Sequence, residues 1–179
     1  MNGWFRIGTA WGAPIEVHFS LPLMLAAMSG FRLAPVFWAL AALLILVHEL
    51  GHAVAARSMR LHVHRIALHG LGGHIETEYP GGLAASARLA SGGVLAQLAV
   101  LAVVLPFAVL DDRKDAAWVQ VQDTLLNWNV AVILLNLLPV APLDGHRIWP
   151  WVRAKVAAWW ATGSPDAKKR RRGGPPRLH

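Results

Sequence analysis

Long apolar stretches separated by short polar segments dominate the chain. A helix that crosses a membrane needs ~20 mainly apolar residues, because each residue rises ~1.5 Å through ~30 Å of hydrocarbon. Three stretches are long enough, residues 34–58, 86–110 and 117–139. Residues 18–31 are short for a span and suit a re-entrant or a tilted segment; the charge pattern described below favours a span. We therefore predict about four transmembrane helices.

The composition supports a membrane protein. Apolar residues make up 55% of the chain and charged residues 15%, whereas soluble domains average ~45–50% and ~25%. The mean hydropathy is +0.42. The chain has no cysteine, which leaves histidine and carboxylate as its metal ligands. The N-terminus lacks the pattern of a secretory signal, so we expect no cleaved leader.

Basic residues divide unevenly between the two predicted sides of the membrane. If residues 18–31 cross, Arg32, Arg113 and Lys114 lie on one side and the other fourteen cations on the opposite side. Cations collect in cytoplasmic loops, so this division predicts that both termini are cytoplasmic. If residues 18–31 do not cross, Arg6 joins the outer side and the asymmetry is weaker.

The C-terminal region combines aromatic and basic residues. Residues 145–161 hold Trp149, Trp151, Trp159 and Trp160 among Arg153 and Lys155, a pattern typical of a helix at the membrane interface. Residues 163–179 carry a basic run with Gly and Pro, which predicts a disordered tail. The tail is either simply solvated or attached to anionic lipid. We expect no nucleic-acid partner, since the basic residues lie in this tail and in cytoplasmic loops.

Ionisable residues interrupt the first long apolar stretch. His48, Glu49 and His52 fit the pattern HExxH, in which two imidazoles on one helix face bind Zn²⁺ and the glutamate serves as general base. A charge at the centre of a spanning helix costs ~2.5–3.5 kcal/mol and is functional by default. Alternatively, the histidines bond backbone carbonyls in the core and Glu49 pairs with Arg57.

A second polar segment, NLLPVAPLDG at residues 136–145, offers the missing ligand. Zinc hydrolases use three protein ligands and leave one position open. Pro139 and Pro142 break the helix and Gly145 permits a turn, so Asp144 can face inward. Zn²⁺ would also offset the charges of Glu49 and Asp144.

These two motifs together resemble the site-2 protease family of intramembrane zinc metalloproteases. The resemblance extends to about Ile148: residues 6–23 are similar to the family's N-terminal entry segment, and residues 65–75 to its glycine-bearing hairpin. It implies Zn²⁺ bound by His48, His52 and Asp144, with Glu49 as catalytic base. The predicted fold is an all-α integral membrane protein of about four transmembrane helices, with a small β-hairpin after the HExxH helix and a C-terminal interfacial helix.

The resemblance also implies a function. The family cleaves peptide bonds within or near transmembrane segments, so the expected partners are a single-span substrate and the lipid bilayer. Residues 1–162 would form the membrane-embedded metalloprotease domain, a minimal form without a PDZ or CBS domain. We expect it in a prokaryotic cytoplasmic membrane, with the active site open to the cytoplasm. Residues 70–82 and 139–145 offer backbone to which an extended substrate strand can add.

The sequence departs from the family at two places. Residues 91–97, SGGVLAQ, lack the usual proline and asparagine, and Gln97 is the nearest amide. His146 replaces a glycine and is an alternative ligand, a partner of Asp144 or a bystander.

Other polar residues have open roles. Asn136 is either an oxyanion donor or a helix-packing amide. Asn127 and Asn129 are interpreted as residues that form hydrogen bonds between helices. Four further histidines follow the HExxH segment, His62, His64, His69 and His74; they lie in solvent or at the interface, or serve a gating or accessory metal role.

Two rival functions come from other classes. A non-proteolytic scaffold with structural zinc would need a fourth protein ligand. A metal transporter would show paired internal repeats with broken helices, and the chain shows no such repeat.

Overall fold

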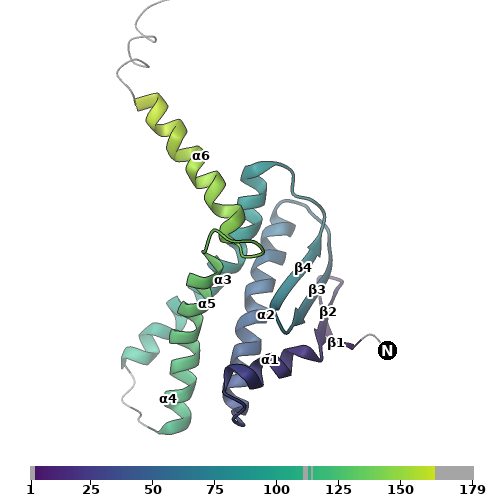
Figure 1. Cartoon of the computed structure of the whole chain (residues 1–179), viewed down its shortest axis with the longest axis vertical. Helices are drawn as coiled ribbons and strands as arrows, with labels where there is room; N and C mark the ends of the chain where they lie inside the picture. The colour runs from purple at the N-terminus through teal and green to yellow at the C-terminus, as the bar shows by residue number, and fades with distance from the viewer. Residues whose placement is uncertain (1–2, 111–112, 114, 164–179) are drawn as a thin grey trace, which may run out of the picture.

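The computed structural model describes residues 3–110, 113 and 115–163, and it combines helices with one β-sheet (Figure 1). The first half of the chain forms β1 (Trp4–Ala10), β2 (Ala13–His18), α1 (Ser20–Met28), α2 (Pro35–Ser58), β3 (Val63–His69) and β4 (Gly72–Thr77). The second half forms α3 (Gly82–Leu110), α4 (Ala116–Asp123), the π-helix η1 (Thr124–Trp128), α5 (Asn129–Asn136) and α6 (Gly145–Gly163).

The four strands form one sheet in the order β1-β2-β3-β4. The outer pairs are antiparallel hairpins, and β2 runs parallel to β3 with Ile15 opposite Ile66. In the first hairpin Trp11 and Gly12 have φ values of 51° and 87°, the left-handed pair that a two-residue turn requires. Strands β1 and β4 are therefore the edges of the sheet.

Helices α2 and α3 pack against each other along their backbones. A Cβ atom on Gly51 would overlap the carbonyl oxygen of Gly92, and one on Gly92 would overlap the carbonyl oxygen of Gly51. Small residues at such crossings allow helices to approach closely in a membrane. This approach brings one face of α2 directly against α3.

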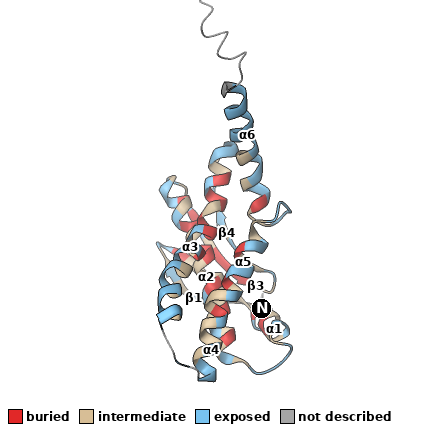
Figure 2. Cartoon of the chain, turned by 90° about the vertical axis from the view of Figure 1, so that its left-hand side faces the viewer, coloured by how far each residue is buried: buried red, intermediate tan, exposed pale blue. Residues whose placement is uncertain are grey.

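The sheet covers another face of α2. One buried cluster joins the strands to α2 and α3 through Ala13, Ala53, Ala56, Val63, Ile66 and Leu89. A second joins α1 and α2 to β3 through Leu21, Leu25, Phe37, Ala41 and Leu68. Figure 2 shows the buried residues gathered where α2, α3 and the strands meet. Helix α2 is thus the central element of the fold.

Arg65 of β3 forms ion pairs with residues of both neighbouring strands, Glu16 of β2 and Glu76 of β4. Its guanidinium lies 3.1 Å from the carboxylate of Glu16 on β2 and 2.5 Å from that of Glu76 on β4. The hydrogen bond from Arg65 holds the pKa of Glu76 below its usual value. These ion pairs add to the backbone hydrogen bonds that hold β3 between β2 and β4.

The prediction of an all-α fold was wrong. The predicted hairpin after α2 is present as β3 and β4, but the N-terminal segment forms a second hairpin that completes a four-stranded sheet. In the edge strand β1, Phe5 and Ile7 are both exposed, at 61% and 60%. The strand therefore lacks a purely polar outer face, and the period-2 pattern that would have revealed it is weak.

The prediction of about four spans was also wrong. Among the described residues, two helices are long and apolar enough to cross a membrane, α2 and α3. Residues 18–31 yield only the nine-residue α1, about 14 Å long at ~1.5 Å per residue. Residues 117–136 are helical, but η1 divides them and α4 contains two glutamines and an aspartate.

The predicted C-terminal helix is present as α6, which begins in contact with α3 and then projects away from the other elements (Figure 1). Its outer part exposes Trp159 and Trp160, at 67% and 65%. The predicted basic tail lies outside the described residues from residue 164 onward, so its disorder stays a prediction.

Candidate metal centre

Helix α2 places three ionisable side chains at one level of the fold. His48 and His52 are one turn apart, so both imidazoles point the same way. Together with Glu49 they are buried, and a ligand atom from each lies within 4.8 Å of the others. Three such groups in an apolar interior need compensation.

Asp144 reaches this cluster from the segment that follows α5. The backbone between Asn136 and α6 is irregular, and Gly145 packs so closely on the carbonyls of Leu137 and Leu138 that a Cβ atom would overlap them. Oδ2 of Asp144 lies 3.2 Å from Nε2 of His48 and 3.3 Å from Nε2 of His52. The structure thus brings together the three side chains that the sequence predicts as ligands.

The three ligand atoms have the spacing of a metal site. The two Nε2 atoms lie 3.0 Å apart, so all three separations fall between 3.0 and 3.3 Å. Tetrahedral zinc with bonds of ~2.0–2.2 Å separates its ligands by roughly 3.3–3.5 Å. Small outward shifts of the side chains are enough to match it.

Hydrogen bonds orient both imidazoles for metal binding. Nδ1 of His48 lies 3.0 Å from Oε1 of Gln97, and Nδ1 of His52 lies 2.9 Å from the carbonyl oxygen of Leu89. An amide or carbonyl oxygen can only accept a hydrogen bond. Each Nδ1 therefore carries the proton, and each Nε2 keeps its lone pair. The N–H of Gly93 also faces Nδ1 of His52, but at 3.3 Å it is farther than the Leu89 carbonyl oxygen, which makes the stronger contact.

Repulsion between these atoms points to a cation. With both protons on Nδ1, a hydrogen bond between the Nε2 atoms would require one ring to be charged. Oδ2 of Asp144 is buried and has no hydrogen-bond partner. Two lone pairs and a carboxylate oxygen therefore face one point, and a divalent ion is the group that these residues fit.

Glu49 is held between α2 and β4. A Cβ atom on Gly73 of β4 would lie 2.5 Å from Cγ and 2.6 Å from Oε1 of Glu49, so only glycine leaves room for this side chain. Oε2 of Glu49 is buried without a hydrogen-bond partner. Glu49 therefore has an acceptor oxygen available beside the three ligands.

Gly93 of α3 provides the space for the imidazoles, which leads to a prediction for Gly93→Ala. A Cβ atom there would lie 2.6 Å from Nε2 of both histidines, so the rings must turn away. We expect zinc affinity to fall roughly 10–100-fold, the loss typical of disturbed ligand orientation. Competition with a coloured chelator measures it. Gly8→Ala is the control, because its Cβ would meet nothing within 4 Å; equal affinity of the two variants would contradict this role.

The structure does not bring Asn136 and His146 into contact with the ligands. Nδ2 of Asn136 donates to the carbonyl oxygen of Val132 in its own helix, at 3.1 Å. His146 is exposed, and its side chain forms no hydrogen bond or ion pair with another described residue. The roles considered for both residues stay predictions.

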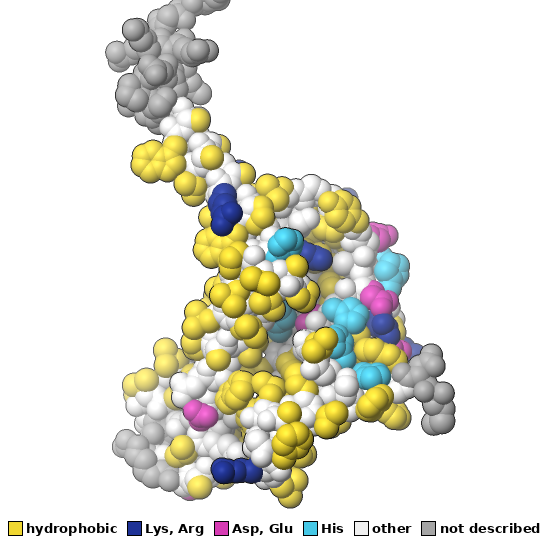
Figure 3. Space-filling view, in the orientation of Figure 1, with side chains coloured by type: hydrophobic (Ala, Val, Ile, Leu, Met, Phe, Trp, Pro, Cys, Tyr) yellow, Lys and Arg dark blue, Asp and Glu magenta, His cyan; other side chains and the backbone are white. Residues whose placement is uncertain are grey.

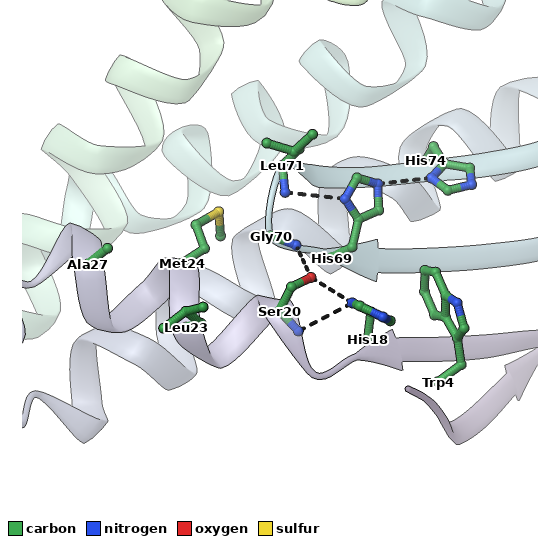
Figure 4. A pocket seen from close by; sticks show the side chains of 10 residues that line it. All are labelled: Trp4, His18, Ser20, Leu23, Met24, Ala27, His69, Gly70, Leu71 and His74. Carbon is green, nitrogen blue, oxygen red and sulfur yellow. Dashed lines mark hydrogen bonds between the residues drawn. The ribbon is translucent and has the colours of Figure 1, made fainter. Parts of the chain in front are cut away.

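Other histidines line a separate open hollow of about 700 Å³ between α1 and the sheet (Figure 4). Nε2 of His69 lies 3.2 Å from Nδ1 of His74, and Nδ1 of His18 lies 2.7 Å from Oγ of Ser20. Burial, aided by His74 and His18, lowers the pKa of His69. Figure 3 shows histidines gathered on this side of the molecule. None of His48, His52 and Asp144 lines this hollow.

Sequence reasoning did not reveal that Gly73 and Gly93 make room for Glu49 and the two imidazoles. It also did not reveal that Gln97 bonds to His48. The glycines matter only through the space that they leave, for which the sequence carries no signal. Gln97 had a signal, since it is an amide in the middle of an apolar helix. Of the two asparagines interpreted as links between helices, Asn129 bonds to α3 through the carbonyl of Gln97, and Asn127 bonds to Asp123 one turn away.

Three curated relatives are similar to this chain in sequence, although no protein-family model matches it. Rip3 of Mycobacterium tuberculosis, which bears a provisional name as a zinc metalloprotease, is 36% identical over 145 residues, 73% of this chain and 36% of that protein. Zinc metalloprotease MJ0392 of Methanocaldococcus jannaschii is 28% identical over 83% of this chain and 45% of its own length. Stage IV sporulation protein FB of Bacillus subtilis is 28% identical over 59% of this chain and 36% of its own length. The chain thus spans less than half the length of these relatives.

The fold also matches a solved structure. The site-2 protease from Methanocaldococcus jannaschii superposes with a TM-score of 0.65 and 24% identity, covering 85% of this chain and 72% of that one. The exposed apolar surface of α3, with Val103, Phe107 and Val109 more than 60% exposed, is that of a helix in contact with lipid. With shared sequence, shared fold and two membrane-type helices, the chain belongs to the site-2 protease family of membrane proteins.

Proposed function

We propose that the chain is an intramembrane zinc metalloprotease that hydrolyses peptide bonds within or near transmembrane segments of membrane proteins. One observation carries the proposal: His48, His52 and Asp144 direct three lone pairs at one point, next to a buried glutamate with an unpartnered oxygen. The names of two relatives, zinc metalloproteases, support it.

The residues divide the chemistry between them. His48, His52 and Asp144 would hold the ion, and bound zinc would act as a Lewis acid and lower the pKa of a water molecule towards ~7. Glu49 accepts the proton of the attacking water through Oε2 and passes it to the leaving amine. Gly73 leaves the space beside β4 that the Glu49 carboxylate occupies, because a Cβ atom there would overlap it.

The substrate would bind as an added strand. Strand β4 pairs with β3 on one side only, and its Gly73 contacts Glu49. A single-span substrate that unwinds and adds to the free edge of β4 would bring its peptide bonds close to Glu49, with the backbone satisfied by strand hydrogen bonds. This arrangement also explains how a helical segment, whose carbonyls are already bonded, becomes open to attack.

We infer that the active site opens to the cytoplasm of a prokaryotic cell. Arg57 and Arg60 lie at the C-terminal end of α2 and Arg88 lies near the start of α3, whereas Arg32 and Arg113 lie near the opposite ends of these helices. The first group has more cations and favours the cytoplasmic side. The basic tail, with its five consecutive cations, would add attraction to anionic lipid at ~1 kcal/mol per cation.

Metal removal tests the proposed function. The chain in lipid nanodiscs is incubated with a panel of single-span membrane proteins tagged at both ends. We expect at least one to be cleaved, the cleavage to stop with a zinc chelator, and added Zn²⁺ to restore it. Cleavage that persists in chelator would contradict zinc chemistry. Zinc binding without cleavage of any substrate would favour the scaffold.

A further inference from the structure

Two buried amides connect the metal centre to a distant helix. Gln97 of α3 and Asn129 of α5 are both 0% exposed. Oε1 of Gln97 faces Nδ1 of His48 at 3.0 Å. Nδ2 of Asn129 donates to the carbonyl oxygen of Gln97, also at 3.0 Å. The contacts form a chain from α5 through Gln97 to His48.

Each amide keeps one buried atom without a partner, Nε2 of Gln97 and Oδ1 of Asn129. An unsatisfied buried polar group costs ~1–3 kcal/mol, so leucine at either position would be the less costly choice for packing alone. Nε2 of Gln97 is a donor and Oδ1 of Asn129 an acceptor. Because the two amides are retained at this cost, the bonds that they do make, to His48 and to the backbone of α3, favour a role in orienting the site.

The π-helix η1 accounts for the position of Asn129. It ends at Trp128, directly before Asn129. One extra residue in a helical turn rotates everything that follows by about 100° around the axis, and such turns occur often at functional sites. Asn129 thereby lies against α3, while Asn127 is exposed.

We propose that Gln97 is a positioning residue that fixes the tautomer of His48, and that Asn129, through its bond to the backbone carbonyl of Gln97, holds the turn of α3 that carries Gln97 against His48. With Oε1 towards His48, the proton must be on Nδ1 and the lone pair on Nε2 points at Asp144 and His52. If the amide rotated, its NH₂ group would face Nδ1 and the proton would move to Nε2, which blocks metal binding. The effect on zinc rests on the proposed function, whereas the tautomer does not.

Nitrogen-15 NMR of histidine in the metal-free chain tests the tautomer. Wild-type His48, assigned by its loss in His48→Gln, should show the tautomer with the proton on Nδ1. Gln97→Leu and Asn129→Leu should yield a mixture of tautomers, and Gln97→Glu, which keeps an acceptor, should retain the wild-type form. Asn127→Leu is the matched control. An unchanged tautomer in both Gln97→Leu and Asn129→Leu overturns the proposal.

Zinc affinity, measured by chelator competition on the same variants, provides the second readout. We expect a loss of roughly 10–100-fold for Gln97→Leu, as for other partners of metal-bound histidines. Asn129→Leu should show a smaller loss, and Asn127→Leu and Gln97→Glu should stay near wild type. If Gln97→Leu does not fold, the comparison of Asn129→Leu with Asn127→Leu decides, and equal affinities overturn the proposal. If the wild type binds no zinc but shows the Gln97-dependent tautomer, the proposed function fails and the positioning role stands.

Discussion

Glu49→Gln should reduce the rate constant of peptide cleavage by roughly 10²–10⁴-fold, the usual contribution of a general base, while zinc stays bound. Glutamine has the shape of glutamate and fits against Gly73, but its amide cannot accept the proton of the attacking water. The three atoms that face the metal position come from other residues. The measurement is single-turnover cleavage of a single-span substrate, with zinc content determined on the same sample.

Glu16→Gln is the matched control. Glu16 belongs to β2 and pairs with Arg65, so the same chemical change there should leave cleavage near the wild-type rate. A Glu49→Gln protein that retains zinc and cleaves as fast as Glu16→Gln would show that the base is another group.

Asp144→Ala should reduce zinc affinity by more than the ~10–100-fold typical of residues that only orient a ligand. The substitution removes one of three ligand atoms and leaves two imidazoles. Cleavage at a fixed low zinc concentration should disappear together with the metal. Equilibrium dialysis against a zinc buffer measures the affinity without a substrate.

Asp123→Ala is the control for that experiment. Asp123 is exposed and bonds to Asn127 within its own helical segment, far in sequence from the ligands. Equal zinc affinity of Asp144→Ala and Asp123→Ala would mean that the carboxylate at position 144 is not a ligand.

The candidate ligand residues could be picked out from the sequence because the chemistry restricts them so strongly. His48 and His52 have the spacing of one helical turn, and Asp144 follows two prolines that end helical structure. Charged groups in apolar stretches are rare and conspicuous. Their convergence, however, depends on how α5 and the following segment pack on α2, and that is a tertiary property.

The sheet could be predicted only in part. The β3–β4 hairpin is local, with a short turn at Gly70 and Leu71 between its strands. The parallel pairing of Ile15 with Ile66 joins distant parts of the chain, and local patterns do not specify such partners. The predicted number of spans was wrong for a related reason. The length of an apolar stretch does not reveal that α1 ends after nine residues or that η1 divides the later segment.

The metal would also resolve an electrostatic problem in the fold. Glu49 and Asp144 both contribute carboxylates beside two neutral imidazoles, among helices that meet lipid. A divalent ion balances those two charges, whereas an empty cluster would keep them uncompensated in an apolar interior.

X-ray absorption of the wild-type chain loaded with one equivalent of zinc is the most direct measurement. The structure predicts a shell of nitrogen and oxygen at ~2.0–2.2 Å, with the scattering pattern of two imidazoles, and Asp144→Ala should retain no stoichiometric zinc. A wild-type chain that binds no zinc, or a shell with more or fewer than two imidazoles, would contradict a centre built from His48, His52 and Asp144.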